Sequence, residues 1–239
     1  MYLSLKKILI LGFLLMVILF NIRSLNQNIS YQLFGEIYTH VETDQKVVAL
    51  TLDDGPNEKI DSILSILNHH QIKATFFPIG NLMENRLSDI KRIVSEGHEV
   101  GNHSYTHQAL SFKTYNSIKQ EIEPTDSLLR QAGFKETIHF RPPYGKKLFM
   151  LPLYLKNNNR KTITWNVIPE GNPDIDQDVE KMSQFVIDKT TNGSIILLHP
   201  MNEGREASLQ ALDPIIRGLK AKGFEFKTIS ELLKLGDLN

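Results

Sequence analysis

The segment VVALTLDDGP, residues 47–56, is the most informative part of the sequence about the fold. Its first six residues are apolar or β-branched and predict a buried strand, and Gly55-Pro56 predicts a turn directly after two carboxylates. In parallel barrels the chemical groups lie at the carboxyl ends of the strands, so Asp53 and Asp54 stand where catalytic residues are expected. Adjacent carboxylates repel each other, and a bound cation is one way to keep both ionised. One of the two could then bind a metal while the other stays free as a base, although Asp-Gly-Pro is also an ordinary turn sequence.

Short apolar stretches alternate with longer amphipathic ones from residue 46 onward. Strands are predicted at residues 47–52, 74–79, 99–102, 137–140, 162–167, 194–198 and 224–227. Helices are predicted at residues 60–68, 87–96, 115–131, 147–155, 179–188, 209–222 and 229–235. This alternation indicates a parallel sheet with helices outside it, and the number of strands favours closure into a barrel over a doubly wound sheet. Pro124 is expected to interrupt its helix, and Asp213-Pro214 to kink or restart another. Neither GxGxxG nor GxxxxGK[ST] occurs, which argues against nucleotide-binding folds.

His103 and His107 stand four residues apart, just after one of the predicted strands. At this spacing two imidazoles on one helical turn face the same side and can reach one ion. Together with a carboxylate they would form a His-His-Asp set that leaves positions open for water and substrate. The spacing is common by chance, so it indicates a metal site only in combination with the other fragments. We interpret His98, whose spacing matches neither histidine, as structural.

The composition excludes several classes of function. Lysine plus arginine equals aspartate plus glutamate, 27 each, so no nucleic-acid-binding surface is predicted. The absence of cysteine excludes thiolate metal sites, a cysteine nucleophile and disulfides. No residue pattern identifies a protein partner.

Residues 8–20 form an unbroken apolar run that Lys6 and Lys7 precede. Extended to residue 22, the run is about 15 residues long, shorter than a spanning helix prefers and within the range of a signal-peptide core. No small-x-small cleavage site follows, so we expect residues 1–23 to be an uncleaved signal anchor rather than a cleaved signal peptide or a buried core helix. The basic flank places the rest of the chain outside the cell, anchored to the membrane, or secreted if the segment is cleaved. The polar, aperiodic residues 24–45 are interpreted as a tether to a domain that spans residues 46–239.

Five fragments resemble, in order, the motifs of the polysaccharide deacetylases, the NodB-homology or carbohydrate esterase family 4 group. They are TLDDGP (51–56), ATFFPIG (74–80), GHEVGNHSYTH (97–107), FRPPYG (140–145) and IILLHP (195–200). The resemblance extends over residues 46–235 and implies an α/β fold, a distorted (β/α)7-type barrel in a single domain. It also implies a metal-dependent hydrolase that removes N-acetyl groups from an acetylated polysaccharide of the cell envelope, such as peptidoglycan or a chitin-like polymer. Some relatives instead remove O-acetyl groups, as from acetylated xylan.

The resemblance assigns a role to nine residues. The catalytic residues are expected to be Asp53 as general base, His199 as general acid and Arg141, which orients the base. The metal ligands are expected to be Asp54, His103 and His107. The substrate and oxyanion contacts are expected to be the backbone N–H of Tyr144 and the apolar walls Trp165 and Leu197. The cofactor is expected to be one divalent ion, zinc by default, since cobalt, nickel and manganese also suit imidazole and carboxylate ligands.

The fourth motif of the family is the place where this chain departs from the pattern. The family usually has an aspartate three residues after the tryptophan and an Asp-Trp pair further on, whereas here these positions hold Ile168, Gly171 and Asn172. Without that anion, His199 would be less easily kept protonated and Arg141 would lose a countercharge.

Three hypotheses follow from this departure. Glu170 or Asp174, in the same loop, supplies the missing charge; or the enzyme is slow or altered but keeps its metal; or the chain is a catalytically silent, glycan-binding member of the fold. A glycosidase is disfavoured, because two adjacent aspartates cannot flank a sugar bond at the ~5 Å or greater separation that such enzymes need.

Overall fold

The computed structural model describes residues 5–236, so residues 1–4 and 237–239 of the expected anchor and domain lie outside the described residues. The helices are α1 (Leu5–Gln27), α2 (Ile60–His69), α3 (Gly80–Met83), α4 (Leu87–Ser95), α5 (Tyr115–Gln131), α6 (Met150–Asn157), α7 (Val179–Lys189), α8 (Glu206–Ala221) and α9 (Ile229–Gly236), with a 3-10 turn at Pro143–Gly145. The strands are β1 (Ile37–Tyr38), β2 (Val47–Asp53), β3 (Thr75–Phe77), β4 (Glu99–Val100), β5 (Thr162–Ile163), β6 (Ile195–Leu198) and β7 (Glu225–Phe226).

Strand β2 is the centre of the sheet, and all seven of its residues are buried. It pairs in parallel with β3, β6 and β7, and β3 pairs in parallel with β4. Single parallel bridges continue the circuit from Asn102 to Phe140, from Phe140 to β5, and from Val167 back to β6. The structure therefore confirms the predicted parallel α/β barrel. The barrel is distorted because single bridges replace continuous strand pairing in part of the circuit. The strand predicted at 137–140 is reduced to bridges at Phe140 because Pro142 and Pro143, just beyond it, have no N–H to donate to a ladder.

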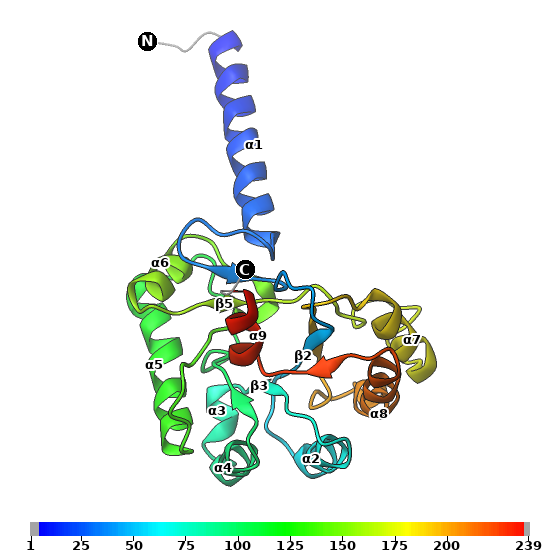
Figure 1. The fold of residues 1–239 in the computed structure, drawn as a ribbon. Coiled ribbons are helices and arrows are strands. Elements are labelled where there is room, and N and C mark those ends of the chain that lie inside the picture. The colour runs from blue at the N-terminus through cyan, green and yellow to red at the C-terminus, as the bar shows by residue number, and fades with distance from the viewer. Residues whose placement is uncertain (1–4, 237–239) are drawn as a thin grey trace.

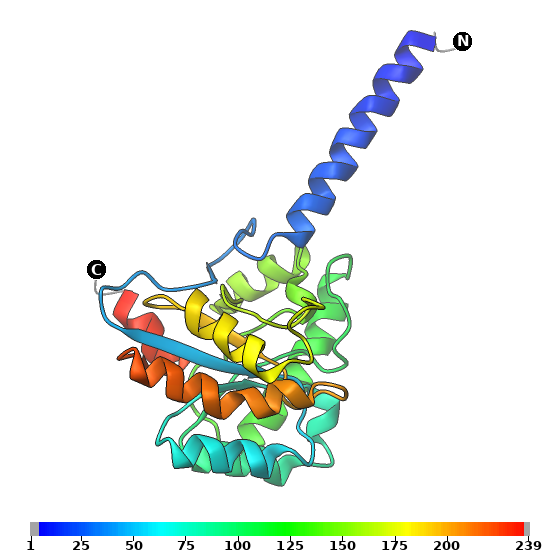
Figure 2. The ribbon, with the colours of Figure 1, turned by 90° about the vertical axis from the view of Figure 1, so that its right-hand side faces the viewer.

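The helices cover the outside of this sheet with apolar faces, as Figures 1 and 2 show for α2, α7 and α8. In α2, for example, the buried residues are Ile60, Ile63, Leu64 and Leu67. The expected interruption at Pro124 and the expected restart at Pro214 were wrong, because α5 and α8 each continue through their proline as one helix. A proline inside a helix removes one hydrogen bond, but both helices bury apolar residues on either side of it, and that packing keeps the two halves aligned.

The N-terminal helix α1 stands away from the barrel in both views (Figures 1 and 2). It is long and apolar enough to cross a membrane, by length and composition. The segment after it differs from the expected tether. Residues 24–27 continue α1, β1 pairs in parallel with β5, and the N–H of the buried Val41 donates to the carbonyl of Gly193 at 3.0 Å. Much of residues 28–45 thus belongs to the folded domain, a contribution that their polar composition hides.

Candidate metal centre and active site

Asp54, His103 and His107 converge at one edge of the barrel. Asp54 directly follows β2, and both histidines lie in the loop after β4. One potential ligand atom from each of the three lies within 4.8 Å of the others. The Asp54 Oδ1 atom is 3.6 Å from Nε2 of His103 and 3.3 Å from Nε2 of His107. Ligand bonds of about 2.0–2.2 Å in a tetrahedral site place the ligand atoms roughly 3.3–3.6 Å apart, so the spacing fits a small divalent ion.

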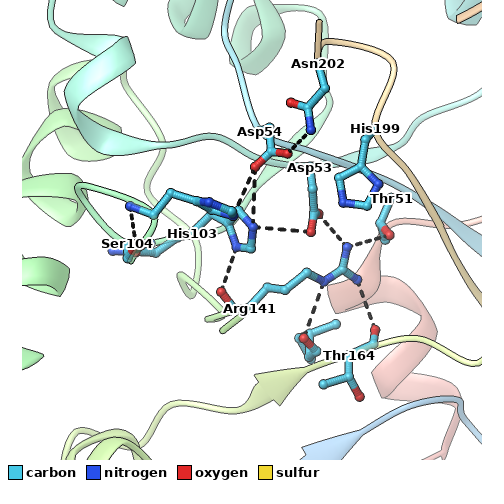
Figure 3. A network of polar contacts seen from close by, with 12 residues as sticks. Thr51, Asp53, Asp54, His103, Ser104, Arg141, Thr164, His199 and Asn202 are labelled. Carbon is cyan, nitrogen blue, oxygen red and sulfur yellow. Dashed lines mark hydrogen bonds and ion pairs between the residues drawn. The ribbon is translucent and has the colours of Figure 1, made fainter. Parts of the chain in front are cut away.

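The two histidines converge through a loop and not through a helical turn, which corrects the helix expected at this HxxxH spacing. Ser104 and His107 have left-handed backbones, with φ of 66° and 58°. The Oγ of Ser104 accepts a hydrogen bond from the His107 N–H at 3.0 Å and closes the turn. This loop brings the imidazole centroids to 4.8 Å, and the Nε2 atoms of both rings lie near Oδ1 of Asp54. Figure 3 shows the His103 ring turned toward Asp54.

The hydrogen bonds and the burial of the three groups suit metal binding. His103 Nδ1 lies 2.8 Å from the carbonyl oxygen of Arg141, which can only accept, so this nitrogen carries the proton and Nε2 presents its lone pair to Asp54. Burial, and then the neighbouring His103, lower the pKa of His107 and favour its neutral ring. Asn202 donates to Asp54 Oδ2 at 2.7 Å, whereas the buried Oδ1 has no hydrogen-bond partner among the described residues. An orphaned carboxylate oxygen facing two imidazoles is the arrangement that a cation completes.

Asp53 lies beside these three groups and is held by an ion pair with Arg141, while its Oδ2 atom lies 3.5 Å from Nε2 of His103 (Figure 3). The fully buried Arg141 donates from one Nη to Asp53 Oδ1 at 2.6 Å and to Thr51 Oγ1 at 2.7 Å. Its other Nη donates to the Thr164 carbonyl at 3.0 Å, and the guanidinium lies 4.2 Å from the centroid of the Phe77 ring. Burial lowers the pKa of Arg141 while Asp53 raises it, and a guanidinium stays charged in either case. Arg141 therefore fixes the position of Asp53, and Asp53 is its countercharge.

His199 lies beside a carboxylate from the loop that departs from the family pattern. Glu170 accepts hydrogen bonds on Oε1 from the His199 N–H and the Ser208 hydroxyl, both at 2.8 Å. The same oxygen is 3.7 Å from Nδ1 of His199, and the Glu170 side chain is 2% exposed. Burial alone would lower the pKa of His199, but Glu170, followed by Asp53, outweighs it and raises that pKa above its ordinary value. Of the two expected charge donors, Glu170 lies next to His199, while Asp174 is exposed in the same loop.

A cleft of about 250 Å³ opens over these groups. It is lined by both aspartates, the three histidines His103, His107 and His199, and Pro142, Tyr144, Trp165, Ile168, Glu170, Gly171, Asn202 and Arg205. Tyr144 has a left-handed backbone, with φ of 59°, and its ring centroid lies 4.8 Å from that of His107. Leu197, an expected wall residue, is 1% exposed within β6 and is absent from this lining.

Sequence reasoning missed three residues that support the site. Asn202 orients Asp54, Thr51 shares an Nη of Arg141 with Asp53, and Ser208 donates to Glu170. Thr51 lies two residues before Asp53 in β2, and this spacing is a signal that the two side chains point to the same side. Asn202 and Ser208 carry no such signal, because a polar residue after a strand or in the first turns of a helix is usually solvated.

The fold is shared with solved structures of carbohydrate esterase family 4. An acetyl xylan esterase from Clostridium thermocellum, solved with cobalt, superimposes with a TM-score of 0.71 and 31% identity, over 80% of this chain and 91% of that one. A family 4 pseudoenzyme from Bacillus anthracis gives 0.75 and 30%, over 85% and 70%. Among curated proteins, a peptidoglycan-N-acetylglucosamine deacetylase of Bacillus cereus is 35% identical over 190 residues, 78% of this chain and 68% of the relative.

The polysaccharide deacetylase family model matches residues 40–166, more than half of the chain, and the chain belongs to this family. The match ends before Glu170 and His199. The chain spans very different shares of its relatives, from 32% of a bifunctional xylanase/deacetylase of Pseudobutyrivibrio xylanivorans to 94% of a Bacillus cereus deacetylase.

Proposed function

We propose that this protein is a metal-dependent deacetylase that removes N-acetyl groups from a polysaccharide of the cell envelope, peptidoglycan or a related N-acetylglucosamine polymer. The observation that carries the proposal is the buried, orphaned Oδ1 of Asp54 facing the Nε2 atoms of His103 and His107, next to Asp53, which Arg141 holds. The names of relatives such as the Bacillus cereus peptidoglycan-N-acetylglucosamine deacetylase support the substrate class.

Asp54, His103 and His107 would hold the ion, and zinc is the metal we propose. A divalent ion held there would supply Lewis-acid chemistry, which polarises an acetyl carbonyl and makes water more acidic. Asp53, held in place by Arg141, takes a proton from the attacking water. His199, kept protonated by Glu170, gives a proton to the departing amine nitrogen. The Tyr144 backbone N–H stabilises the developing oxyanion, and Trp165 forms an apolar wall for the acetyl group.

We also propose that residues 1–23 anchor the protein in the cell membrane, with the barrel outside the cell. The length and apolar composition of α1 and the lysines before its apolar run support this. In this division the deacetylase domain is residues 46–239, with β1 and the strand-like Val41 segment packed onto it.

A second candidate is a catalytically silent glycan-binding protein. It is favoured by the departure from the family pattern at Ile168, Gly171 and Asn172, and by the resemblance to a family 4 pseudoenzyme. Such a protein would keep the cleft and the ion, but it would not transfer protons.

Acetate release separates these functions. The full chain, purified in detergent, is incubated with N-acetylglucosamine oligomers, peptidoglycan and acetylated xylan, before and after chelation and after metal is restored. The proposal expects release from the N-acetylated substrates that chelation abolishes and metal restores, and that His199→Ala abolishes while bound metal is unchanged. Release from xylan alone would indicate an O-acetyl esterase; metal and glycan binding without release would indicate the silent protein; release that survives complete metal removal would refute the mechanism.

A further inference from the structure

The end of α1 is fastened to the barrel next to the active site. The Ser111 hydroxyl bonds to Oδ1 of Asn26, near the last turn of α1. Lys147, 1% exposed, donates from Nζ to the Asn28 carbonyl at 2.6 Å, and Thr164 donates to the Ile29 carbonyl at 2.8 Å. Thr164 is also the residue whose carbonyl holds Arg141. Because these contacts join α1 directly to the barrel, the direction of α1 determines which face of the barrel lies toward the medium around the helix.

That face carries exposed aromatic and apolar side chains together with lysines. We call it the Phe112 face, and its members are Phe112, Lys113, Tyr144, Lys146, Phe149 and Met150. Phe112 is 76% exposed, Tyr144 61%, Phe149 40% and Met150 37%. Phe112, Lys113 and Lys146 line one hollow with Asn26 at the end of α1. Within residues 5–236, neither Lys113 nor Lys146 has an ion-pair partner.

The two halves of this face belong to one unit of the fold. Leu110, two residues before Phe112, packs in the same buried cluster as Leu151 of α6, the helix that Met150 begins. Figure 1 shows α6 beside the lower end of α1, whereas α2 and α4 lie at the far end of the molecule. Scattered apolar residues on a surface need no explanation, but a set gathered around the base of a membrane-length helix does.

We propose that the Phe112 face rests on the headgroup layer of the membrane that α1 enters. The apolar run of α1 ends at residue 22, so Arg23 to Asn28 lie at headgroup level if the run occupies the hydrocarbon. Phe112, Lys113 and Lys146 line a hollow with Asn26 of that segment. Exposed aromatic rings and lysines are the residue types that reside in this interface, and anionic headgroups attract unpaired lysines.

This orientation, which rests on the anchoring proposed above, sets what the active site reaches. Tyr144 belongs both to the Phe112 face and to the lining of the cleft, and the Lys146 Nζ lies 5.6 Å from the centroid of its ring. The cleft therefore opens beside the bilayer. The acetylated sugars that fit this position are those held close to the outer surface of the membrane that α1 enters, either attached to lipid or in the innermost layer of the glycan.

Spin labelling of the full chain in vesicles of phosphatidylethanolamine and phosphatidylglycerol tests the orientation, and the chain has no cysteine of its own. Single cysteines replace Leu14 in α1, Phe112, or the exposed Lys91 on α4, which serves as the control. Accessibility of the nitroxide to oxygen, which is enriched in the bilayer, is compared with its accessibility to a water-soluble nickel chelate. We expect a label at position 14 to be accessible to oxygen and not to the chelate, and a label at position 91 to be accessible to the chelate. A label at position 112 should give an intermediate ratio. If the label at position 14 is buried in the bilayer but the labels at positions 112 and 91 have the same accessibilities, the proposed contact of the Phe112 face with the membrane is overturned. A water-exposed label at 14 overturns the anchoring and the face together.

A second measurement links the face to substrate. We compare acetate release from N-acetylglucosamine oligomers attached to lipid in these vesicles with release from the free oligomer. Lys113→Gln should lower release from the vesicles by about fivefold, the factor expected for one basic residue at an anionic surface, and leave release from the free oligomer unchanged. Equal effects on both substrates overturn the proposal while leaving the deacetylase function intact. Failure of both substrates in the unaltered chain would instead refute the proposed function.

Discussion

Two neighbouring aspartates at the end of β2 have different surroundings that give them different chemistry. Asp53 is 1% exposed and is bound to a guanidinium, so its charge is already balanced. Asp54 is 4% exposed and faces two imidazoles with an unpartnered oxygen, so its charge needs a cation. The backbone enforces the difference, because Asp54 has a left-handed φ of 69° that turns its side chain away from the direction the strand would give it.

Substitution of each aspartate by asparagine should therefore separate binding from catalysis. Asp54→Asn should lose the metal, since an amide oxygen binds a divalent ion much more weakly than a carboxylate. Asp53→Asn should keep the metal and lose at least ~10²-fold in kcat, the usual contribution of a general base. Elemental analysis of the purified variants and acetate release measure the two effects. Loss of metal in Asp53→Asn would show that the ligand set is assigned wrongly.

Glu170 should set the pH range over which His199 can act as an acid. Because Glu170 raises the pKa of His199, the imidazolium persists to higher pH, and activity is lost as the pH rises through that raised pKa. In Glu170→Gln the high-pH limb of the kcat profile should move to lower pH, with a loss of up to ~10²-fold in the alkaline range and a much smaller loss near pH 5.

The matched control is Asp174→Asn, in the same loop, which should leave the profile unchanged. Glu170→Asp retains the charge and should restore part of the alkaline activity. A uniform loss at every pH in Glu170→Gln would assign Glu170 only a structural role.

At the scale of elements, apolar patterning predicted the long helices and the buried strands because burial follows hydrophobic periodicity. It failed where packing decides. The two residues of β1 have no pattern of their own and become a strand only because β5 offers an edge. Pro124 and Pro214 break no helix because apolar residues are buried on both sides of each.

The residues of the site were predictable from order and type, but their geometry was not. Four-residue spacing suggested a helix for His103 and His107, and only the left-handed backbone of Ser104 and His107 produces the same convergence from a loop. The sequence offered two carboxylates near His199, and the choice of Glu170 depends on the turn of a loop that no local pattern specifies.

The contact of the 28–45 segment with the barrel depends on Gly193. Its φ is +73°, and a Cβ atom there would lie 1.7 Å from the carbonyl oxygen of Val41. Gly193→Ala should therefore lower the thermal midpoint by about 10 °C, while Gly133→Ala, also left-handed but with open space around it, should lower it by about 3 °C. Thermal unfolding of both variants in detergent checks this, and equal shifts would mean that the segment does not dock through Gly193.

Across the whole molecule, ionisable groups are buried at both ends of the barrel. The active site occupies the carboxyl ends of β2, β4 and β6, whereas His98 precedes β4 at the opposite end. His98 is 3% exposed; its Nδ1 accepts the N–H of Ala74, and its Nε2 has no hydrogen-bond partner among the described residues. Burial, and then Lys73, lower its pKa to about 4. The His98 ring is therefore neutral in the folded protein at neutral pH.

This burial should make the fold sensitive to acid. Between about pH 6.5 and pH 4, His98 is protonated in the unfolded chain but not in the folded chain. The free energy of unfolding therefore falls across that window by roughly 1.4 kcal/mol per pH unit as the pH is lowered. Glu99, whose pKa burial raises, acts in the opposite direction, so two chains must be compared. His98→Asn keeps an acceptor for Ala74 and should flatten the pH dependence of the urea-unfolding free energy by that amount. Parallel curves for the two chains would show that folding does not lower the pKa of His98.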